Sequence, residues 1–405
     1  MRKIEEKCHS PKVGISMKIE NHDQTNTVER LAKLLDNRSR LPMAFSLGTR
    51  DGKSITLGGE EPEFKIIIKN KIGLRAIKSL NELKVAEAYI NDDLDVEGDF
   101  IKAMSIRNAL ADRNTWIKAW RRLAPLLFGR VRLNPKWVAK HYDLNNIQLI
   151  IIDNKYNTYT QGIYESDDEI AEAGAERKLA VAFQSLRLKP DDSVLDIGCG
   201  WGGFLRFAAG QGAQVTGITL SKDQKQYVEE LIRENKFQAE VLYQDFFTFQ
   251  PPKKYDGIVM MGVLEDLSDY QRVMNKLPGF LKPGGRIYLD FTASKTSFST
   301  SSFTTKYVWP GTFRPVYMPQ FIDAIRKSPL EIVALHNDRH NYYLWGKKGH
   351  DRWMQKKQEI ILRSDEQFWR MFRIILAGVA GNMSCPDYSL TAYRMLLELP
   401  KDIVI

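Results

Sequence analysis

Cysteine and histidine are scarce in this chain. Its 405 residues include three cysteines and six histidines. The cysteines, Cys8, Cys199 and Cys385, lie far apart in the sequence, which argues against a disulfide framework and favours a reducing compartment. No pair of cysteines or histidines has the spacing of zinc ligands, so we expect no structural metal site.

The sequence also shows no long apolar run and no signal-peptide pattern. The longest apolar stretches, near residues 147–152 and 374–381, are far shorter than a membrane span of about 20 residues. Residues 1–20 mix charges with single apolar residues and show no signal-peptide core. We therefore expect a cytoplasmic protein. The length permits two or three globular domains.

The net charge of +9 is concentrated in one segment, residues 113–140, which has eight basic residues and no acid. Its apolar residues at helical spacing are Trp116, Ala119, Trp120, Leu123 and Leu127. A basic helix with a Trp/Leu face predicts contact with an anionic membrane surface. A buried helix between two domains is the alternative. No nucleic-acid partner is expected, because no groove-reading or RNA-binding motif accompanies the charge.

Composition and periodicity divide the chain into four parts. Strand-like residues 43–47 and 54–57 flank the hairpin signal Thr49-Arg-Asp-Gly52, and a third strand and two helices are expected after them. The predicted parts are a partly disordered N-terminal extension (1–42), a small α+β domain (43–112), a basic amphipathic connector (113–140) and a large domain (141–405).

The most informative stretch is residues 194–203, Val-Leu-Asp-Ile-Gly-Cys-Gly-Trp-Gly-Gly. A short apolar strand ends near Asp196, glycines form a turn, and a helix is expected over residues 204–209. Glycine permits positive φ and close approach of a ligand to the backbone. Open α/β sheets bind nucleotide-like ligands at this end of a strand. The spacing lacks the third glycine of the dinucleotide fingerprint, which suits a ligand without a pyrophosphate. An ordinary glycine-rich turn is the alternative.

Further strands and helices alternate along the large domain. Ser221 is the predicted N-cap of a helix that extends through Glu230, and Lys282-Pro-Gly-Gly285 predicts a tight turn. The additional strands are expected at 214–220, 240–243, 257–261 and 286–289. This alternation predicts an α/β fold with a parallel, doubly wound, Rossmann-like sheet, preceded by the small α+β domain.

The glycine-rich turn resembles motif I of the S-adenosylmethionine-dependent methyltransferases. With Thr219-Leu-Ser-Lys-Asp-Gln224, it resembles the cyclopropane-fatty-acyl-phospholipid synthases. Other segments that carry the resemblance are His141-Tyr-Asp-Leu144 upstream of Tyr159-Thr160, Lys306-Tyr-Val-Trp-Pro-Gly311 with Pro315, Ala86-Glu-Ala-Tyr89, and Asp93-Leu-Asp-Val-Glu-Gly-Asp99. The resemblance spans about residues 43 to 395.

This resemblance implies S-adenosylmethionine as the cofactor. The implied cofactor-binding residues are Tyr159, Thr160, Asp196, Gly198, Cys199, Gly200, Trp201, Gly202, Thr219, Leu220, Gln224, Asp245 and Phe246. Thr219 and Gln224 would offer neutral hydrogen bonds to the ribose, where many methyltransferases have an acid. Residues 159–160 would close over the cofactor, and residues 245–246 would flank the adenine.

The resemblance also implies the reaction, in which an activated methyl group is transferred to a cis double bond of a phospholipid acyl chain. Loss of a proton from the resulting carbocation closes a cyclopropane ring. Members of the family hold a bicarbonate base with Cys, Glu, His, Ile and Tyr. Here Glu265 matches the Glu, Gln161 stands for the Cys, Asp290 for the His, Thr292 for the Ile, and Ile375 or Phe372 for the Tyr. An acid at position 290 beside Glu265 would repel bicarbonate, which argues against that mechanism.

Several hypotheses therefore stay open. Glu265 or Asp290 can be the base itself, because two neighbouring acids raise the pKa of one of them. The product can be a ring, a methyl branch or a methylene group. The substrate can instead be a small amine or another soluble nucleophile, since an acidic pocket suits a cation, or the chain can be a non-catalytic lipid-binding relative. For the leading hypothesis we expect peripheral association with the inner face of the membrane. The family's tendency to dimerise leaves a homodimer open.

Overall fold

The computed structural model describes residues 43–50, 52–79, 81–105, 155–267, 269–294, 301–308, 314–384 and 390–402. The chain divides into two compact units, Met1–Thr115 with Glu366–Met371, and Trp116–Asp365 with Phe372–Ile405. The predicted extension (1–42) and basic connector (113–140) lie outside the described residues, as do residues 141–144 and 309–311. The bounds of the four predicted parts therefore stay predictions.

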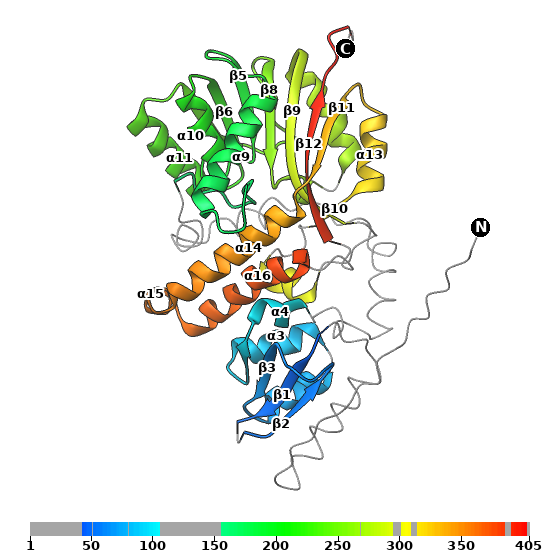
Figure 1. Cartoon of the computed structure of the whole chain (residues 1–405). Coiled ribbons are helices and arrows are strands. Elements are labelled where there is room, and N and C mark those ends of the chain that lie inside the picture. Colours follow the sequence, from blue (N-terminus) through cyan, green and yellow to red (C-terminus); the bar gives the residue numbers. More distant parts are fainter. Residues whose placement is uncertain are drawn as a thin grey trace, which may run out of the picture. The chain divides into compact units, whose positions relative to one another are not determined.

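The first unit contains a four-stranded sheet with the order β2-β1-β3-β4 (Figure 1). Its elements are β1 (Phe45–Thr49), β2 (Ser54–Leu57), β3 (Phe64–Ile68), α2 (Lys71–Ser79), α3 (Glu82–Ile90), β4 (Leu94–Gly98) and α4 (Phe100–Ser105). Strands β1 and β2 form the predicted antiparallel hairpin, with Gly52 at φ +91° in the turn. Phe45 and Phe64 stack with ring centroids 5.3 Å apart, so the sheet has an aromatic core.

The second unit is built on an eight-stranded sheet with the order β11-β12-β9-β8-β5-β6-β7, and β10 pairs with β9. The strands are β5 (Ser193–Ile197), β6 (Gln214–Thr219), β7 (Ala239–Tyr243), β8 (Tyr255–Met261), β9 (Leu281–Ser294), β10 (Val316–Tyr317), β11 (Glu331–Asn337) and β12 (Leu390–Glu398). Strands β7, β6, β5, β8 and β9 are parallel, as predicted. Beyond the predicted parallel strands the sheet is mixed, because β12 is antiparallel to both β9 and β11. Periodicity indicates that a strand exists and says nothing about its direction.

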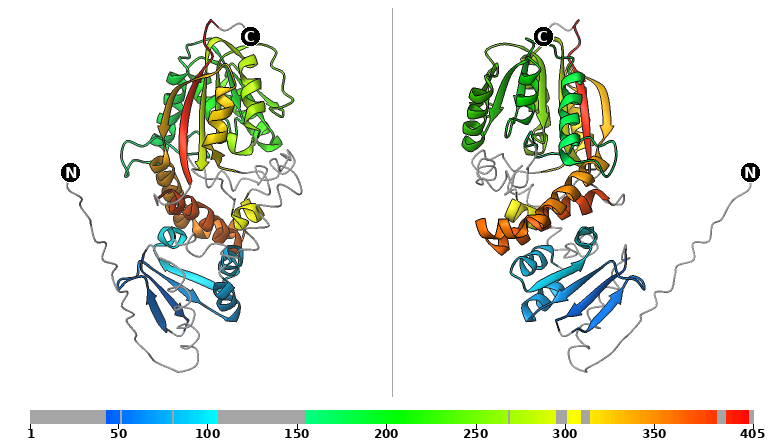
Figure 2. Two further views of the ribbon diagram at one scale, coloured as in Figure 1. Left: turned by 90° about the vertical axis from the view of Figure 1, so that its right-hand side faces the viewer. Right: turned by 60° about the vertical axis from the view of Figure 1, so that its left-hand side comes forward.

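Helices cover both faces of this sheet (Figure 2), which confirms the doubly wound α/β fold. The covering helices are α9 (Ala171–Ser185), α10 (Gly203–Gly210), α11 (Lys222–Asn235), α12 (Tyr270–Lys276) and α13 (Met318–Arg326). The other helical elements are α14 (Arg339–Gln355), α15 (Lys357–Arg363), α16 (Glu366–Ser384) and the short turns η1 (Leu264–Asp266), η2 (Leu277–Phe280) and η3 (Thr304–Val308). Helices α9, α10 and α11 share one buried cluster, whereas α12 and α13 share the other. The Ser221 hydroxyl caps α11 by accepting from the backbone N of Gln224 at 3.2 Å.

Strand β9 begins earlier and ends later than predicted. The expected tight turn at residues 282–285 lies within the strand as the structure assigns it, with Gly284 at φ +79° and a shift in the register of pairing with β8. The carboxyl end extends through Ser294, which carries Asp290 and Thr292 into the interior. Among the described residues, none of the helices combines the length and apolar character needed to cross a bilayer.

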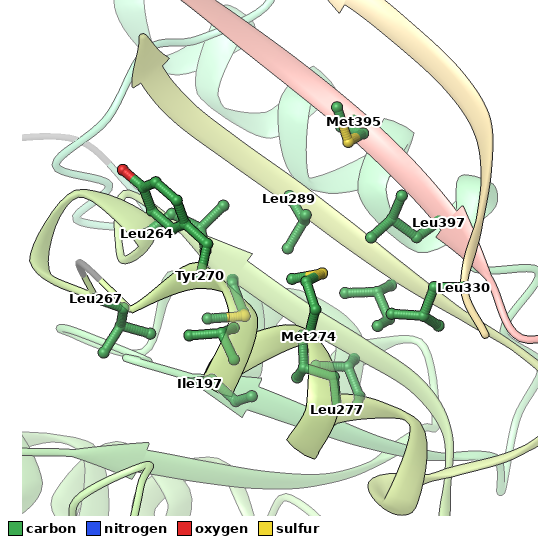
Figure 3. Close-up of a cluster of buried hydrophobic side chains, with 14 of the residues drawn as sticks. Ile197, Leu264, Leu267, Tyr270, Met274, Leu277, Leu289, Leu330, Met395 and Leu397 are labelled. Atoms are coloured by element: carbon green, nitrogen blue, oxygen red, sulfur yellow. The ribbon is translucent and has the colours of Figure 1, made fainter. Parts of the chain in front are cut away.

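One hydrophobic cluster holds the short turn η1 against the sheet (Figure 3). Leu264 of this turn is fully buried, and Leu267 and Tyr270 follow it into the same cluster. They pack with Leu289 of β9 and Ile197 of β5, both of which are almost completely buried. The packing fixes the backbone on both sides of Glu265, so the position of this carboxyl group depends on the hydrophobic core.

Removing a side chain from this cluster is expected to be costly. Leu289→Ala leaves a cavity in this cluster that the surrounding side chains cannot fully fill. The free energy of unfolding should therefore fall by about 2–5 kcal/mol. Leu362→Ala is the matched control, because Leu362 is 87% exposed, and its effect should stay within about 0.5 kcal/mol. Denaturant unfolding checks this. Equal midpoints for the two variants would show that the cluster does not stabilise the fold.

Candidate functional site

A cavity lies at the carboxyl ends of the central parallel strands, where the glycine-rich turn joins β5 to α10. Of the predicted cofactor residues, its lining includes Tyr159, Thr160, Asp196, Gly198, Cys199, Gly200, Trp201, Thr219, Leu220, Gln224, Asp245 and Phe246. Gly202 is not part of the lining; it has φ +79° and precedes helix α10. The complete lining comes from six separate stretches of the sequence, within residues 157–160, 178–179, 196–204, 218–224, 244–246 and 261–267.

The glycine-rich turn has a conformation that requires glycine. Gly198 has φ +70°, and a Cβ atom there would lie 2.5 Å from Cγ2 of Val263. The backbone N–H groups of Gly198 and Cys199 both donate to the carbonyl of Ile218, at 2.9 and 3.0 Å. The turn is therefore tied to the neighbouring strand β6, and its backbone borders the cavity without intervening side chains at the glycines.

Thr219 and Gln224 form a polar pair at the cavity wall. The Thr219 hydroxyl donates to Oε1 of Gln224 at 2.7 Å, and both side chains are buried. The bond orients the Gln224 amide, and the pair offers neutral polar atoms to a ligand. This arrangement is compatible with the predicted role of the pair toward ribose hydroxyls, which stays a prediction.

Asp196 is the carboxylate in this lining best suited to a cationic ligand. It is 3% exposed, and its Oδ2 atom has no hydrogen-bond partner in the part of the chain that the structure describes. Burial raises the pKa of Asp196 to about 7, although a hydrogen bond from the backbone of Leu205 and the charge of Lys178 oppose the shift. A buried carboxylate with an open oxygen fits the ammonium of an amino acid, and hence the amino-acid end of S-adenosylmethionine.

Lys178 is the residue that sequence reasoning missed. Lys178 lines the cavity, and its ammonium group forms an ion pair with Asp290 at 2.7 Å and donates to the Thr160 hydroxyl. The side chains of Lys178 and Asp290 are each 1% exposed. A signal was present in the sequence: Lys178 lies at helical spacing from Gly174, Ala175 and Ala182, the buried face of α9. A lysine in such a stripe is rarely buried without a partner.

Glu265 is the second buried acid near the cavity. Burial raises its pKa to about 8, and the charge of Asp266 adds to the shift. Hydrogen bonds to Oε1 from the Thr292 backbone N (2.6 Å) and hydroxyl (2.9 Å) oppose it. The sequence predicts that two neighbouring acids, Glu265 and Asp290, raise the pKa of one of them. Instead the carboxylate that contributes is Asp266, and Asp290 is paired with Lys178.

None of the three predicted catalytic residues belongs to the cavity lining, but each is adjacent to a lining residue in sequence or through a contact. Gln161 follows Thr160, Glu265 precedes Asp266, and Asp290 reaches the lining through Lys178. In the described part of the chain, Oε1 of Gln161 and Oε2 of Glu265 have no hydrogen-bond partner. Oε1 of Gln161 and, when Glu265 is ionised, its Oε2 are acceptors, so neither atom offers a donor to an anionic oxygen of bicarbonate.

Comparison with known proteins identifies the family. The family described as mycolic acid cyclopropane synthetase matches residues 131–390, and a domain of unknown function matches residues 31–115. The chain belongs to the mycolic acid cyclopropane synthetase family. It is an S-adenosylmethionine-dependent methyltransferase, and the predicted family resemblance and cofactor are confirmed.

The relatives agree with this assignment. The cyclopropane-fatty-acyl-phospholipid synthase of Escherichia coli K12 is 26% identical over 380 residues, covering 90% of this chain and 95% of the relative. The probable fatty acid methyltransferase Rv3720 of Mycobacterium tuberculosis is 28% identical over 230 residues, which is 55% of this chain and only 53% of the relative. The cyclopropane synthase MmaA2 from M. tuberculosis superposes with a TM-score of 0.61 at 22% identity, covering 65% of this chain and 98% of that one, and shows the same fold.

The pKa of Asp196 predicts how cofactor affinity depends on pH. Below about pH 7 this carboxyl group is protonated and attracts the cofactor's ammonium less, so Kd for S-adenosylhomocysteine should rise by about tenfold for each pH unit below the pKa. Calorimetric titration from about pH 5.5 to 8.5 measures this. Asp196→Asn should bind more weakly and lose the pH dependence; an unchanged slope in this variant would assign the titration to another group.

Because the ion pair is buried, removing one of its charges is predicted to destabilise the fold more than removing both. Asp290→Asn leaves the Lys178 ammonium buried without its counter-charge, and the free energy of unfolding should fall by about 3–5 kcal/mol. Lys178→Met combined with Asp290→Asn removes both charges and should recover most of that loss. Denaturant unfolding of the wild type and the single and double variants forms the cycle. Additive effects of the two substitutions would show that the side chains do not interact.

Proposed function

We propose that this methyltransferase transfers the methyl group of S-adenosylmethionine to a cis-unsaturated acyl chain of a membrane phospholipid. The observation that carries the proposal is the environment of Glu265, a buried carboxyl group with one open oxygen and a pKa raised to about 8. Methylation of an alkene produces a carbocation that must lose a proton. A base for that proton has to lie close to the cavity and out of water.

Glu265 meets these requirements. Thr292 holds Oε1, which leaves Oε2 to accept a proton. S-Adenosylmethionine supplies the activated methyl group when bound. The alkene's electron pair would form the new C–C bond as the S–CH3 bond of the cofactor breaks and S-adenosylhomocysteine leaves. A C–H bond of the methylated chain would then break, its electron pair would close a ring or form a methylene group, and Glu265 would take the proton. With a pKa raised to about 8, this carboxylate is a stronger base than an ordinary glutamate.

The location of the substrate is part of the proposal. The basic segment 113–140, with its Trp/Leu stripe, lies outside the described residues and supports a peripheral position at an anionic membrane surface by its composition. The two relatives described above carry names that refer to fatty acids or fatty-acyl phospholipids. The same lipid class is proposed for this chain, and ring, branch and methylene products are separated by experiment.

Methylation of a small amine is the second candidate. An acidic pocket around Asp290 would attract a cationic amine. The ion pair with Lys178 offsets the negative charge of Asp290, so the attraction of this pocket for a cationic substrate is weaker. A non-catalytic lipid-binding relative is a third candidate. Asp196 and Glu265 argue against it, because each has a buried carboxyl oxygen without a hydrogen-bond partner in the described part of the chain. Such atoms cost stability, and a role in binding or catalysis explains why they are kept.

Phospholipid vesicles test the proposed substrate. The purified chain is incubated with methyl-labelled S-adenosylmethionine and vesicles of dioleoyl phospholipid, with fully saturated dipalmitoyl vesicles as the matched control. Label and the mass of one added CH2 should appear on the unsaturated chains alone, and fragmentation distinguishes ring from methylene. Labelling of neither vesicle by a chain that binds the cofactor would refute the lipid substrate.

Glu265→Gln tests the base. The amide preserves the acceptor for Thr292 and cannot take a proton, so methyl transfer should fall by about 100-fold or more, while S-adenosylhomocysteine binding stays unchanged. Because burial raises the pKa of Glu265 in the folded state from its ordinary 4.5 to about 8, the wild type loses stability as pH rises from about 4.5 to about 8. The variant should therefore melt higher than the wild type at about pH 8.5. The exposed Glu230→Gln is the control. Full activity in Glu265→Gln would exclude this residue as the base.

A further inference from the structure

Lys178 has bonding capacity that the ion pair does not use. A lysine ammonium has three N–H donors. Among the described residues its partners are the Asp290 carboxylate and the Thr160 hydroxyl. Since Lys178 also lines the cavity, one donor remains for a ligand there. Its burial makes it unlike the surface lysines of this chain, which can satisfy their donors with water.

Asp196 lines the same cavity and complements this donor. Its open Oδ2 atom is an acceptor, and the charge of Lys178 acts on it, as the lowering effect of Lys178 on the pKa of Asp196 shows. The cavity wall therefore combines one buried cation and one buried anion. An α-amino acid carries the opposite pair, an anionic carboxylate and a cationic ammonium, on one carbon atom.

We propose that Lys178 binds the α-carboxylate of the cofactor's amino-acid part while Asp196 binds its α-ammonium. Asp290 holds the ammonium group of Lys178 in place and supplies the charge that makes its burial tolerable. Thr160 fixes a second of its donors and is itself part of the lining. The inference rests on the cofactor and is independent of the lipid substrate.

The sequence left open whether Asp290 or Glu265 is the base. In this arrangement Asp290 has a different role. Asp290 does not line the cavity, and its nearest ionic partner is Lys178. It is a positioning residue that acts through Lys178. Glu265, which is held by Thr292, is left as the proton acceptor, so the two buried acids have separate tasks.

The test compares S-adenosylhomocysteine with its decarboxylated analogue, which keeps the amine and lacks the carboxylate. Calorimetry with the full chain should give about tenfold to a hundredfold weaker binding of the analogue by the wild type, the loss expected for one charge-assisted hydrogen bond. Equal affinities in the wild type would overturn the proposal without any variant.

Variants then assign the carboxylate contact to Lys178. Lys178→Met with Asp290→Asn removes the contact and leaves no unpaired buried charge, so the two ligands should bind within about twofold of each other. Lys178→Arg, which keeps a cation, should retain part of the discrimination. Full discrimination in the double variant would overturn the assignment. Because these measurements need no lipid, their failure is distinct from a failure of methyl transfer to vesicles.

Discussion

The buried ion pair between Lys178 and Asp290 is the interaction on which the site depends. It joins helix α9 to strand β9, and through the Thr160 hydroxyl it also holds the segment that lines the cavity before α9. Two charges in the interior are tolerated only when each has its partner. The pair therefore links the stability of the large unit to the geometry of its cofactor cavity.

The topology gives three buried acids three different environments at one end of the sheet. Asp196 belongs to β5, Glu265 follows β8, and Asp290 belongs to β9, and these strands are adjacent and parallel. Asp196 keeps an open oxygen at the cavity. Glu265 is held on one side by Thr292, and Asp290 is matched by a lysine. In the proposed assignment, environment rather than residue type separates the acid that binds a ligand, the acid that takes up a proton and the acid that positions a lysine.

Local patterns in the sequence predicted much of this arrangement, because the features concerned are local. The glycine-rich turn, the Ser221 cap and the central parallel strands depend on residues close to one another in the chain. The antiparallel direction of β12 and the partner of Asp290 depend on contacts between distant segments, Lys178 and Asp290 being 112 positions apart, so no periodicity records them. The sequence predicted an acidic pocket around Asp290 for the same reason: the counter-charge, Lys178, comes from another element, helix α9.

The proposed base, Glu265, is supplied by the protein itself. The measurement that tests this proposal most directly is the rate of methyl transfer to dioleoyl vesicles, at saturating cofactor, in carbon dioxide-free buffer over a range of pH. The account predicts a rate that rises as Glu265 ionises, levels above its apparent pKa, and does not change when bicarbonate is added. A rate that collapses in carbon dioxide-free buffer and returns with bicarbonate would contradict it.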